Sequence, residues 1–179
     1  MRTCKALLLS MLLVLLSSCA PAKSEVVEEV PKITLSEARE FQNHALLELA
    51  TYVPTDAVVG GMDTPIPQMN GMTCDWAKSG NAASAESGVF LPGGYDIEVS
   101  SGVDLHRVLE QIQTDYREKG WQAYWDEGGK GSSMNLISSE GYEFILTALP
   151  ARNLSQKLRM SSFSPCLRTP EGFTLFDQY

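Results

Sequence analysis

The chain has 179 residues, of which 44% are hydrophobic and 20% are charged, so it carries enough apolar side chains for one globular domain of ordinary size. It has 22 acidic residues against 14 basic ones, which gives a formal net charge of −8 at pH 7. A surface of this sign repels the phosphates of nucleic acids, so no nucleic-acid partner is expected.

Residues 1–18 have the layout of a secretory signal. Two basic residues, Arg2 and Lys5, precede an almost unbroken apolar run over Ala6–Leu16, and small polar residues follow it. A membrane-spanning helix needs about 20 apolar residues, and this run is roughly half that length. The segment is therefore predicted to be an export signal that does not itself span the membrane.

The signal ends in the tetrapeptide Leu16, Ser17, Ser18 and Cys19. This stretch closely resembles the lipobox of bacterial lipoproteins, which is a leucine, two small residues and a cysteine. The resemblance implies that the Cys19 thiol receives a diacylglycerol, that residues 1–18 are cleaved off, and that Cys19 becomes the acylated first residue of the mature chain. The alternative is an ordinary signal peptide whose apolar run ends near a cysteine by chance.

The acyl chains on Cys19, palmitate among them, must then supply the whole membrane attachment. Loss of Arg2 and Lys5 leaves 12 basic residues against 22 acidic ones, a net charge near −10, so no polybasic anchor remains. Each buried CH2 group contributes about 0.8 kcal/mol, and two or more chains hold stably. In layout the chain is similar to small envelope lipoproteins of Gram-positive bacteria, particularly actinobacteria. This similarity implies a location on the extracytoplasmic face of the cell membrane and assigns no functional residue in the domain.

Residues 20–32 are small, acidic and bounded by prolines, with three glutamates and no aromatic side chain. They bury too little apolar surface to offset the entropy of ordering a chain, so residues 19–32 are predicted to form a flexible tether. Residues 33–179 contain no internal repeat and no second change in composition. They are predicted to form a single globular domain.

The domain opens with an amphipathic helix. Thr34 and Glu37 have the spacing of a capping box, and apolar residues follow at intervals of three to four until Pro54. Residues 53–71 are rich in proline, glycine and aspartate, which predicts a long loop, and a short strand is expected over 72–77.

A strand and a second helix follow. Residues 95–99 alternate between apolar and polar side chains, as a half-buried strand does. Asp104 is a suitable N-cap, and Gly120 is predicted to end the helix at its C′ position, with Tyr116 and Trp121 as the apolar pair of a Schellman motif.

Four alternating runs complete the chain, over 121–126, 132–139, 142–149 and 155–164. Glycine-rich or polar turns separate them, so they are predicted to form an antiparallel meander. The element order of helix, two strands, helix and four strands predicts a two-layer α+β domain, with two amphipathic helices packed on a mostly antiparallel sheet.

Two of the four cysteines remain for the folded domain, since Cys4 leaves with the signal and Cys19 is acylated. Outside the cytoplasm, Cys74 and Cys166 are predicted to form a disulfide. The alternative is a pair of buried free thiols. Two isolated cysteines do not make a zinc site, which needs four ligands in close groups.

No catalytic, cofactor-binding or metal-binding residue is predicted. Glu40, His44 and Glu48 recur at intervals of four on the first helix, but such a stripe is more typical of a solvated charged face than of a metal site. Residues 128–132 resemble a phosphate-binding loop, yet they join two strands and do not open a helix. His106 is expected on the surface, near the start of the second helix, and no nucleophile motif accompanies either histidine.

Two groups of side chains are candidates for binding. Trp121 and Trp125 are expected to point to one face of a strand and Tyr124 to the other, so one set belongs to the core and the other is open to a ligand. Lys157 and Arg159 share a strand face in an otherwise acidic protein, with Arg152 and Arg168 nearby in sequence. This pair is a candidate docking spot, or part of an ordinary solvated strand with alternating charge.

The leading functional hypothesis is a lipid-anchored, non-catalytic interaction module that contacts a protein, a wall polymer or a small ligand at the cell envelope. The first alternative is a carrier of an apolar molecule between sheet and helices, which a cavity between the layers would favour. The second alternative is a small envelope hydrolase, which carboxylates converging in a cleft would favour. A fully packed interior favours the interaction module.

Overall fold

The computed structural model describes residues 33–61, 64–65, 71–74, 88–126, 132–152 and 155–169. The predicted signal, the lipobox cysteine Cys19, the tether and the glycine-rich turn at 128–131 lie outside these ranges, as does Trp76. The first described helix begins two residues after Ile33, where the predicted domain starts.

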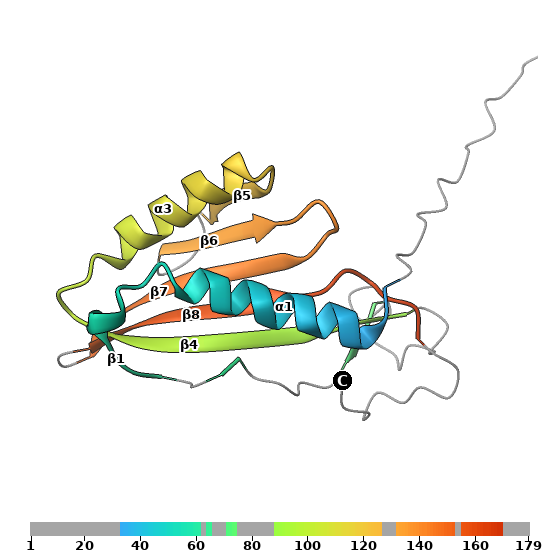
Figure 1. Ribbon diagram of the computed structural model, residues 1–179, viewed down its shortest axis with the longest axis horizontal. Coiled ribbons are helices and arrows are strands. Elements are labelled where there is room, and N and C mark those ends of the chain that lie inside the picture. The colour runs from blue at the N-terminus through green and yellow to red at the C-terminus, as the bar shows by residue number, and fades with distance from the viewer. Residues whose placement is uncertain are drawn as a thin grey trace, which may run out of the picture.

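A six-stranded antiparallel sheet forms one layer of the fold (Figure 1). Its strand order is β1-β4-β8-β7-β6-β5, so the last four strands of the chain form the predicted meander and β4 extends it. The strands in this spatial order are β1 (Val58–Gly61), β4 (Pro92–Ser100), β8 (Ser155–Phe163), β7 (Glu143–Arg152), β6 (Ser132–Ile137) and β5 (Gln122–Asp126).

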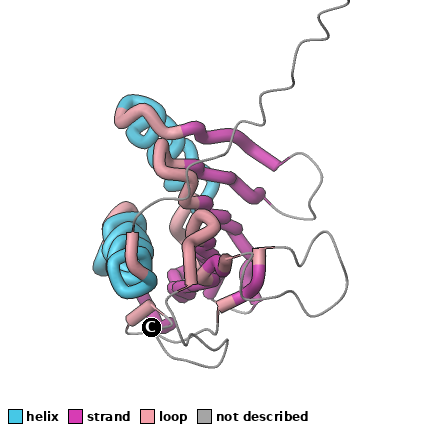
Figure 2. The backbone as a smooth tube through the Cα atoms, turned by 90° about the vertical axis from the view of Figure 1, so that its right-hand side faces the viewer, coloured by secondary structure: helices cyan, strands magenta, loops and turns pink. Residues whose placement is uncertain are grey.

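Two helices form the second layer, and both lie on the same face of the sheet (Figure 2). Helix α1 (Leu35–Ala50) contacts β4 and β8, and helix α3 (Leu105–Glu118) contacts β5, β6 and β7. The predicted two-layer α+β architecture is therefore confirmed. The opposite face of the sheet is not covered by either of these helices.

The core lies between the helices and the sheet. Alternation along the strands sends every second side chain toward the helices, where these side chains lose essentially all contact with solvent. Fully buried members come from both layers, among them Leu46, Leu49, Leu109, Ile112, Met134, Leu136, Phe144, Leu146, Leu158 and Met160, all 0% exposed.

Both helices begin as the sequence predicts, and α3 also ends as predicted, whereas α1 ends at Ala50, before Pro54. The Thr34 side chain accepts a hydrogen bond from the Glu37 amide, and the Glu37 carboxylate accepts one from the Thr34 amide, which completes the capping box. Asp104 caps α3 by accepting from the Arg107 amide. Gly120 has a φ of +85°, and the Trp121 amide donates to the Tyr116 carbonyl at 2.9 Å, as in a Schellman motif.

The two helices are also joined to each other. The Tyr52 hydroxyl donates to Asp115 at 2.9 Å, and the Lys119 ammonium lies 2.5 Å from the Glu48 carboxylate. Burial and the bond to Asp115 raise the pKa of Tyr52 to about 12, so this tyrosine remains a donor at neutral pH. These contacts fix the C-terminal ends of α1 and α3 relative to one another.

The prediction of an uninterrupted loop over 53–71 is wrong. A 3₁₀ turn, η1 (Thr55–Ala57), leads into β1, whose Val58 lies opposite Val99 of β4. The strand is only four residues long and exposed throughout, so it has no alternation to reveal it, and its pairing with the edge of β4 determines its conformation.

The strand expected over 72–77 is confirmed at its start, and Cys74 already lies in a turn. The described part of this strand is β2 (Met72–Thr73), which pairs with β3 (Val89–Phe90) in a small separate sheet. The chain bearing Cys74 therefore lies beside the start of β4. The sulfurs of Cys74 and Cys166 are 2.07 Å apart and their Cα atoms 6.0 Å apart, which is the predicted disulfide.

Candidate functional site

The sheet face opposite the helices, called here the outer face, carries rows of side chains that run across the strands. Its central row is entirely polar and consists of Asp126, Ser133, Thr147, Arg159 and Asp96, which are successive partners in the strand register from β5 to β4. The hydroxyls of Ser133 and Thr147 are hydrogen-bonded at 3.0 Å. The polar row thus contains donors and acceptors at a spacing of about 4.8 Å, the distance between neighbouring strands.

An ion-pair cluster occupies the β4 and β8 end of this row. Arg159 makes a two-point contact with Asp96, in which Nε donates to Oδ1 at 3.2 Å and Nη2 donates to Oδ2 at 3.3 Å. Lys157 lies 3.4 Å from Asp96 and 3.8 Å from Glu98. The hydrogen bonds and charge of Asp96 raise the pKa of Arg159, which keeps the guanidinium charged. The four formal charges of the cluster sum to zero.

A hollow of about 460 Å³ opens beside this cluster. We call it the β7–β8 hollow, because its lining comes chiefly from the ends of these two strands. The side chains of Lys157 and Arg159 border it together with one carboxylate, an apolar ledge and two further polar residues, namely Glu98, Leu149, Pro150, Ser155 and Gln156. Its volume falls in the range of about 300 to 1,000 Å³ typical of small-molecule sites.

A smaller hollow, of about 280 Å³, lies at the β1 edge of the molecule. We call it the edge hollow. Leu47 of α1 and Val58 of β1 belong to its lining, and they are 45% and 43% exposed. Val59, beside them in the chain, is 60% exposed. Leu47 and Val58 thus expose apolar surface at the same hollow, where α1 ends and β1 begins.

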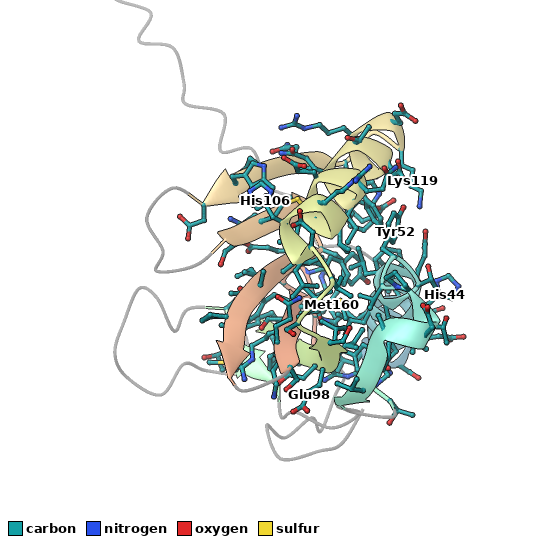
Figure 3. The ribbon with its side chains drawn as sticks, turned by 90° about the vertical axis from the view of Figure 1, so that its left-hand side faces the viewer. His44, Tyr52, Glu98, His106, Lys119 and Met160 are labelled. Atoms are coloured by element: carbon teal, nitrogen blue, oxygen red, sulfur yellow. A yellow bond between two sulfur atoms is a disulfide. The ribbon has the colours of Figure 1, made fainter. Side chains whose placement is uncertain are left out.

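The candidate metal stripe on α1 does not become a site. His44 is exposed, and Glu48 is taken by its ion pair with Lys119. Within the described ranges, no three histidine, cysteine or carboxylate side chains are grouped to hold a metal ion. Figure 3 shows His44, His106 and Glu98 well apart from one another, so neither histidine lies beside the Glu98 carboxylate of the outer face.

The aromatic candidates divide as the alternation predicts. Trp121 and Trp125 pack against the core, whereas Tyr124 is 45% exposed on the outer face. Trp125 is also covered by the ring of His106, and the centroids of the two stacked rings are 4.7 Å apart. The Nδ1 atom of His106 lies 3.4 Å from the Glu110 carboxylate. His106 is therefore an exposed residue with structural contacts.

The basic candidates also divide. Lys157 and Arg159 share the outer face, as predicted, but Arg168 lies beyond the opposite end of β8, and the side chain of Arg152 is outside the described part of the chain. Sequence reasoning missed the carboxylates of Asp96 and Glu98 that accompany the basic pair. Their alternation with Tyr95, Ile97 and Val99 placed them on one face of a strand, but only the register of β4 against β8 joins the two sets.

Comparison with known proteins adds one structural neighbour. The chain is similar to the crystal structure of a DUF4853 family protein from Actinomyces odontolyticus ATCC 17982, with 18% sequence identity over 84% of this chain and 79% of that chain, at a TM-score of 0.48. No protein-family model and no curated protein matches the sequence. None of the described helices is both long and apolar enough to cross a bilayer.

Proposed function

We propose that this protein is an extracytoplasmic lipoprotein, anchored through acyl chains on Cys19, that acts as a non-catalytic interaction module. The observation that carries the interaction role is the difference between the two faces of the sheet. The helices bury one face in a core of fully buried side chains, while the outer face presents the polar row, the ion-pair cluster and the β7–β8 hollow. Ordered polar groups beside a hollow are what a recognition surface needs.

The anchor has its own support. The tetrapeptide ending in Cys19 resembles a lipobox, and the domain contains a disulfide, which is a typical feature of proteins outside the cytoplasm. Replacing Cys19 by serine should leave an uncleaved precursor or release the protein from membranes. A processed Cys19→Ser protein that still fractionates with membranes would place the anchor elsewhere.

The interaction role can be tested by photo-crosslinking in living cells. A benzophenone amino acid in place of Tyr124 should capture a partner, because this residue is exposed on the outer face. The matched control is the same amino acid in place of His44, which is exposed on the helix layer. Capture that is equal from both layers, or that occurs only from His44, would contradict the proposal.

The edge hollow favours a second candidate, the carrier of an apolar molecule. Its lining includes Val53, Tyr95 and Ile97, and it lies between α1 and the sheet. The small volume of the edge hollow argues against this candidate. Buried side chains fill the centre of the space between the helices and the sheet, so the hollow does not extend into it. Mass spectrometry of organic extracts from the purified lipidated protein and from a Val58→Lys variant would reveal a carried molecule that the lysine displaces.

A further inference from the structure

The two cations beside the β7–β8 hollow have more donors than their carboxylates use. A guanidinium has five N–H donors, of which Arg159 gives two to Asp96. An ammonium has three, and Lys157 gives one to Asp96 at 3.4 Å, while Glu98 at 3.8 Å is beyond hydrogen-bond distance. With respect to the described residues, the pair therefore retains N–H groups for the oxygen atoms of a ligand.

Acceptors and apolar surface complete the lining. Glu98, whose side chain is 44% exposed, borders the hollow with a carboxylate that accepts no hydrogen bond from the part of the chain that the structure describes. Gln156 donates its amide N–H groups to the carbonyls of Ser100 and Val103, which orients the side chain. Leu149 and Pro150 provide an apolar ledge. A ligand must therefore offer hydroxyl donors, oxygen acceptors and C–H surface together.

Charge decides between the ligands that carry such groups. An anion would approach Lys157 and Arg159 but also meet the carboxylates of Asp96 and Glu98, on a chain with a net charge of −8 before processing. A cation would likewise be repelled by the two basic side chains. A neutral polyol is not repelled by either sign of charge in the cluster. It also avoids the cost of removing water from an ion.

We propose that the β7–β8 hollow binds one end of a neutral glycan chain, and that this chain lies across the strands along the polar row, from Arg159 through Thr147 toward Ser133. Hydroxyls in Thr147 and Ser133 continue the supply of donors and acceptors beyond the hollow. The row from Asp96 to Asp126 crosses five strands and is about 19 Å long, so it suits a polymer better than a single sugar. The inference rests on the proposed function, whose outer face it uses, and specifies the class of partner.

The test measures binding of defined neutral tetrasaccharides of glucose, galactose, mannose, arabinose and N-acetylglucosamine to the lipidated mature protein in nanodiscs. At least one of them should bind at millimolar concentration or below and shift backbone amide resonances of β4, β7 and β8. Arg159→Ala should weaken that binding at least about tenfold, because it removes hydrogen bonds from a charged group. Leu149→Ser should also weaken it, because it removes the apolar surface of the ledge. Arg168→Ala is the matched control, because it removes the same charge from an exposed residue away from the hollow and should leave affinity unchanged.

Three outcomes would overturn the proposal. They are no binding of any neutral tetrasaccharide, preferential binding of an acidic tetragalacturonate, and sugar binding that Arg159→Ala and Leu149→Ser leave unchanged. Far-ultraviolet circular dichroism of each variant separates lost binding from lost folding. If the sugars fail while crosslinking from Tyr124 still captures a protein in cells, the glycan proposal fails and the proposed interaction function stands.

Discussion

The guanidinium of Arg39 reaches from α1 into the sheet layer, where its Nη1 donates to the carbonyl oxygen of Pro92 at 2.6 Å. Arg39 is only 5% exposed, and its burial lowers the pKa of the guanidinium. Gln42, one turn further along α1, donates to the Leu91 carbonyl at 2.7 Å and to the Ser162 hydroxyl at 3.3 Å. A buried polar group must be hydrogen-bonded to be tolerated, so these bonds fix how α1 sits on β4 and β8.

This arrangement requires glycine at position 93. A Cβ atom there would lie 2.5 Å from the Ser162 Oγ and 3.3 Å from the Arg39 Nη1. Gly93→Ala should therefore lower the free energy of unfolding by about 1 to 3 kcal/mol, as overpacking does. Gly102→Ala is the control, because a Cβ at that glycine meets nothing within 4 Å, and it should change stability by less than about 0.5 kcal/mol.

A double-variant cycle in urea tests the cause. Ser162→Ala removes the oxygen that the new methyl group would strike, so the cost of Gly93→Ala should be smaller in that background than in the natural sequence. Strictly additive costs would show that the methyl group does not meet Ser162.

The disulfide should provide a large part of the stability of the domain. It joins residues 92 apart in sequence, and closing a loop of that length lowers the entropy of the unfolded chain enough to contribute about 4 to 5 kcal/mol. The variant with both Cys74→Ala and Cys166→Ala should unfold at correspondingly lower urea concentration. Reductant should bring the unmodified protein to the same midpoint and leave the double variant unaffected. Two freely alkylated thiols in the native protein, detected by mass spectrometry, would refute the bond.

The capping box gives α1 a defined dependence on pH. Hydrogen bonds from the Thr34 amide, and then from its hydroxyl, lower the pKa of Glu37 below its ordinary value of 4.5. A carboxylate with a lowered pKa in the folded state stabilises that state fully above 4.5, and this contribution disappears as the pH falls through the folded-state pKa. The difference in melting temperature between the natural protein and Glu37→Gln should therefore shrink as the pH is lowered from neutral to about 3. Glu40→Gln removes the same charge from the exposed side of α1, and an equal pH response in that variant would speak against the cap as the cause.

The sequence predicts the features of this fold that depend on near neighbours in the chain. The caps at Thr34 and Asp104 and the glycine at 120 each act within four residues, so their local patterns identify both helices. The strand β1 has no such pattern, because its conformation depends on Val99, some forty residues away. Sequence alone therefore could not separate it from a loop.

The candidate site was likewise predictable only where it depends on near neighbours in the chain. Alternation along β8 placed Lys157 and Arg159 on one face, which the structure confirms. Asp96 lies 61 residues before Lys157, and its role in the cluster depends on the β4 and β8 register, which no local pattern specifies. The buried position of Arg39 was missed for a different reason. A long polar side chain on a helix is expected in solvent unless the backbone carbonyls that it will meet are known.

The last prediction concerns the free edge of the sheet at β5, which ends the strand order. Edge strands expose backbone groups that can pair with another chain, and proteins commonly block them. Here Arg117 of α3 donates to the Ala123 carbonyl from Nε at 2.9 Å and from Nη2 at 2.5 Å, and Gln113 donates to the same oxygen at 3.3 Å. These side chains occupy an acceptor that a neighbouring strand would otherwise use.

Replacing Arg117 by alanine should therefore increase self-association, and adding Gln113→Ala should increase it further. Sedimentation velocity over a concentration series measures the effect as a rise in average mass relative to the unmodified protein. Arg107→Ala is the matched control, since it removes the same charge from an exposed position of α3 and leaves the Ala123 contacts intact. A mass distribution that stays the same in the Arg117 and Gln113 variants would show that these bonds only hold α3 on β5. A rise that Arg107→Ala reproduces would instead attribute association to the loss of charge, because every basic residue removed changes the repulsion between copies of an acidic protein.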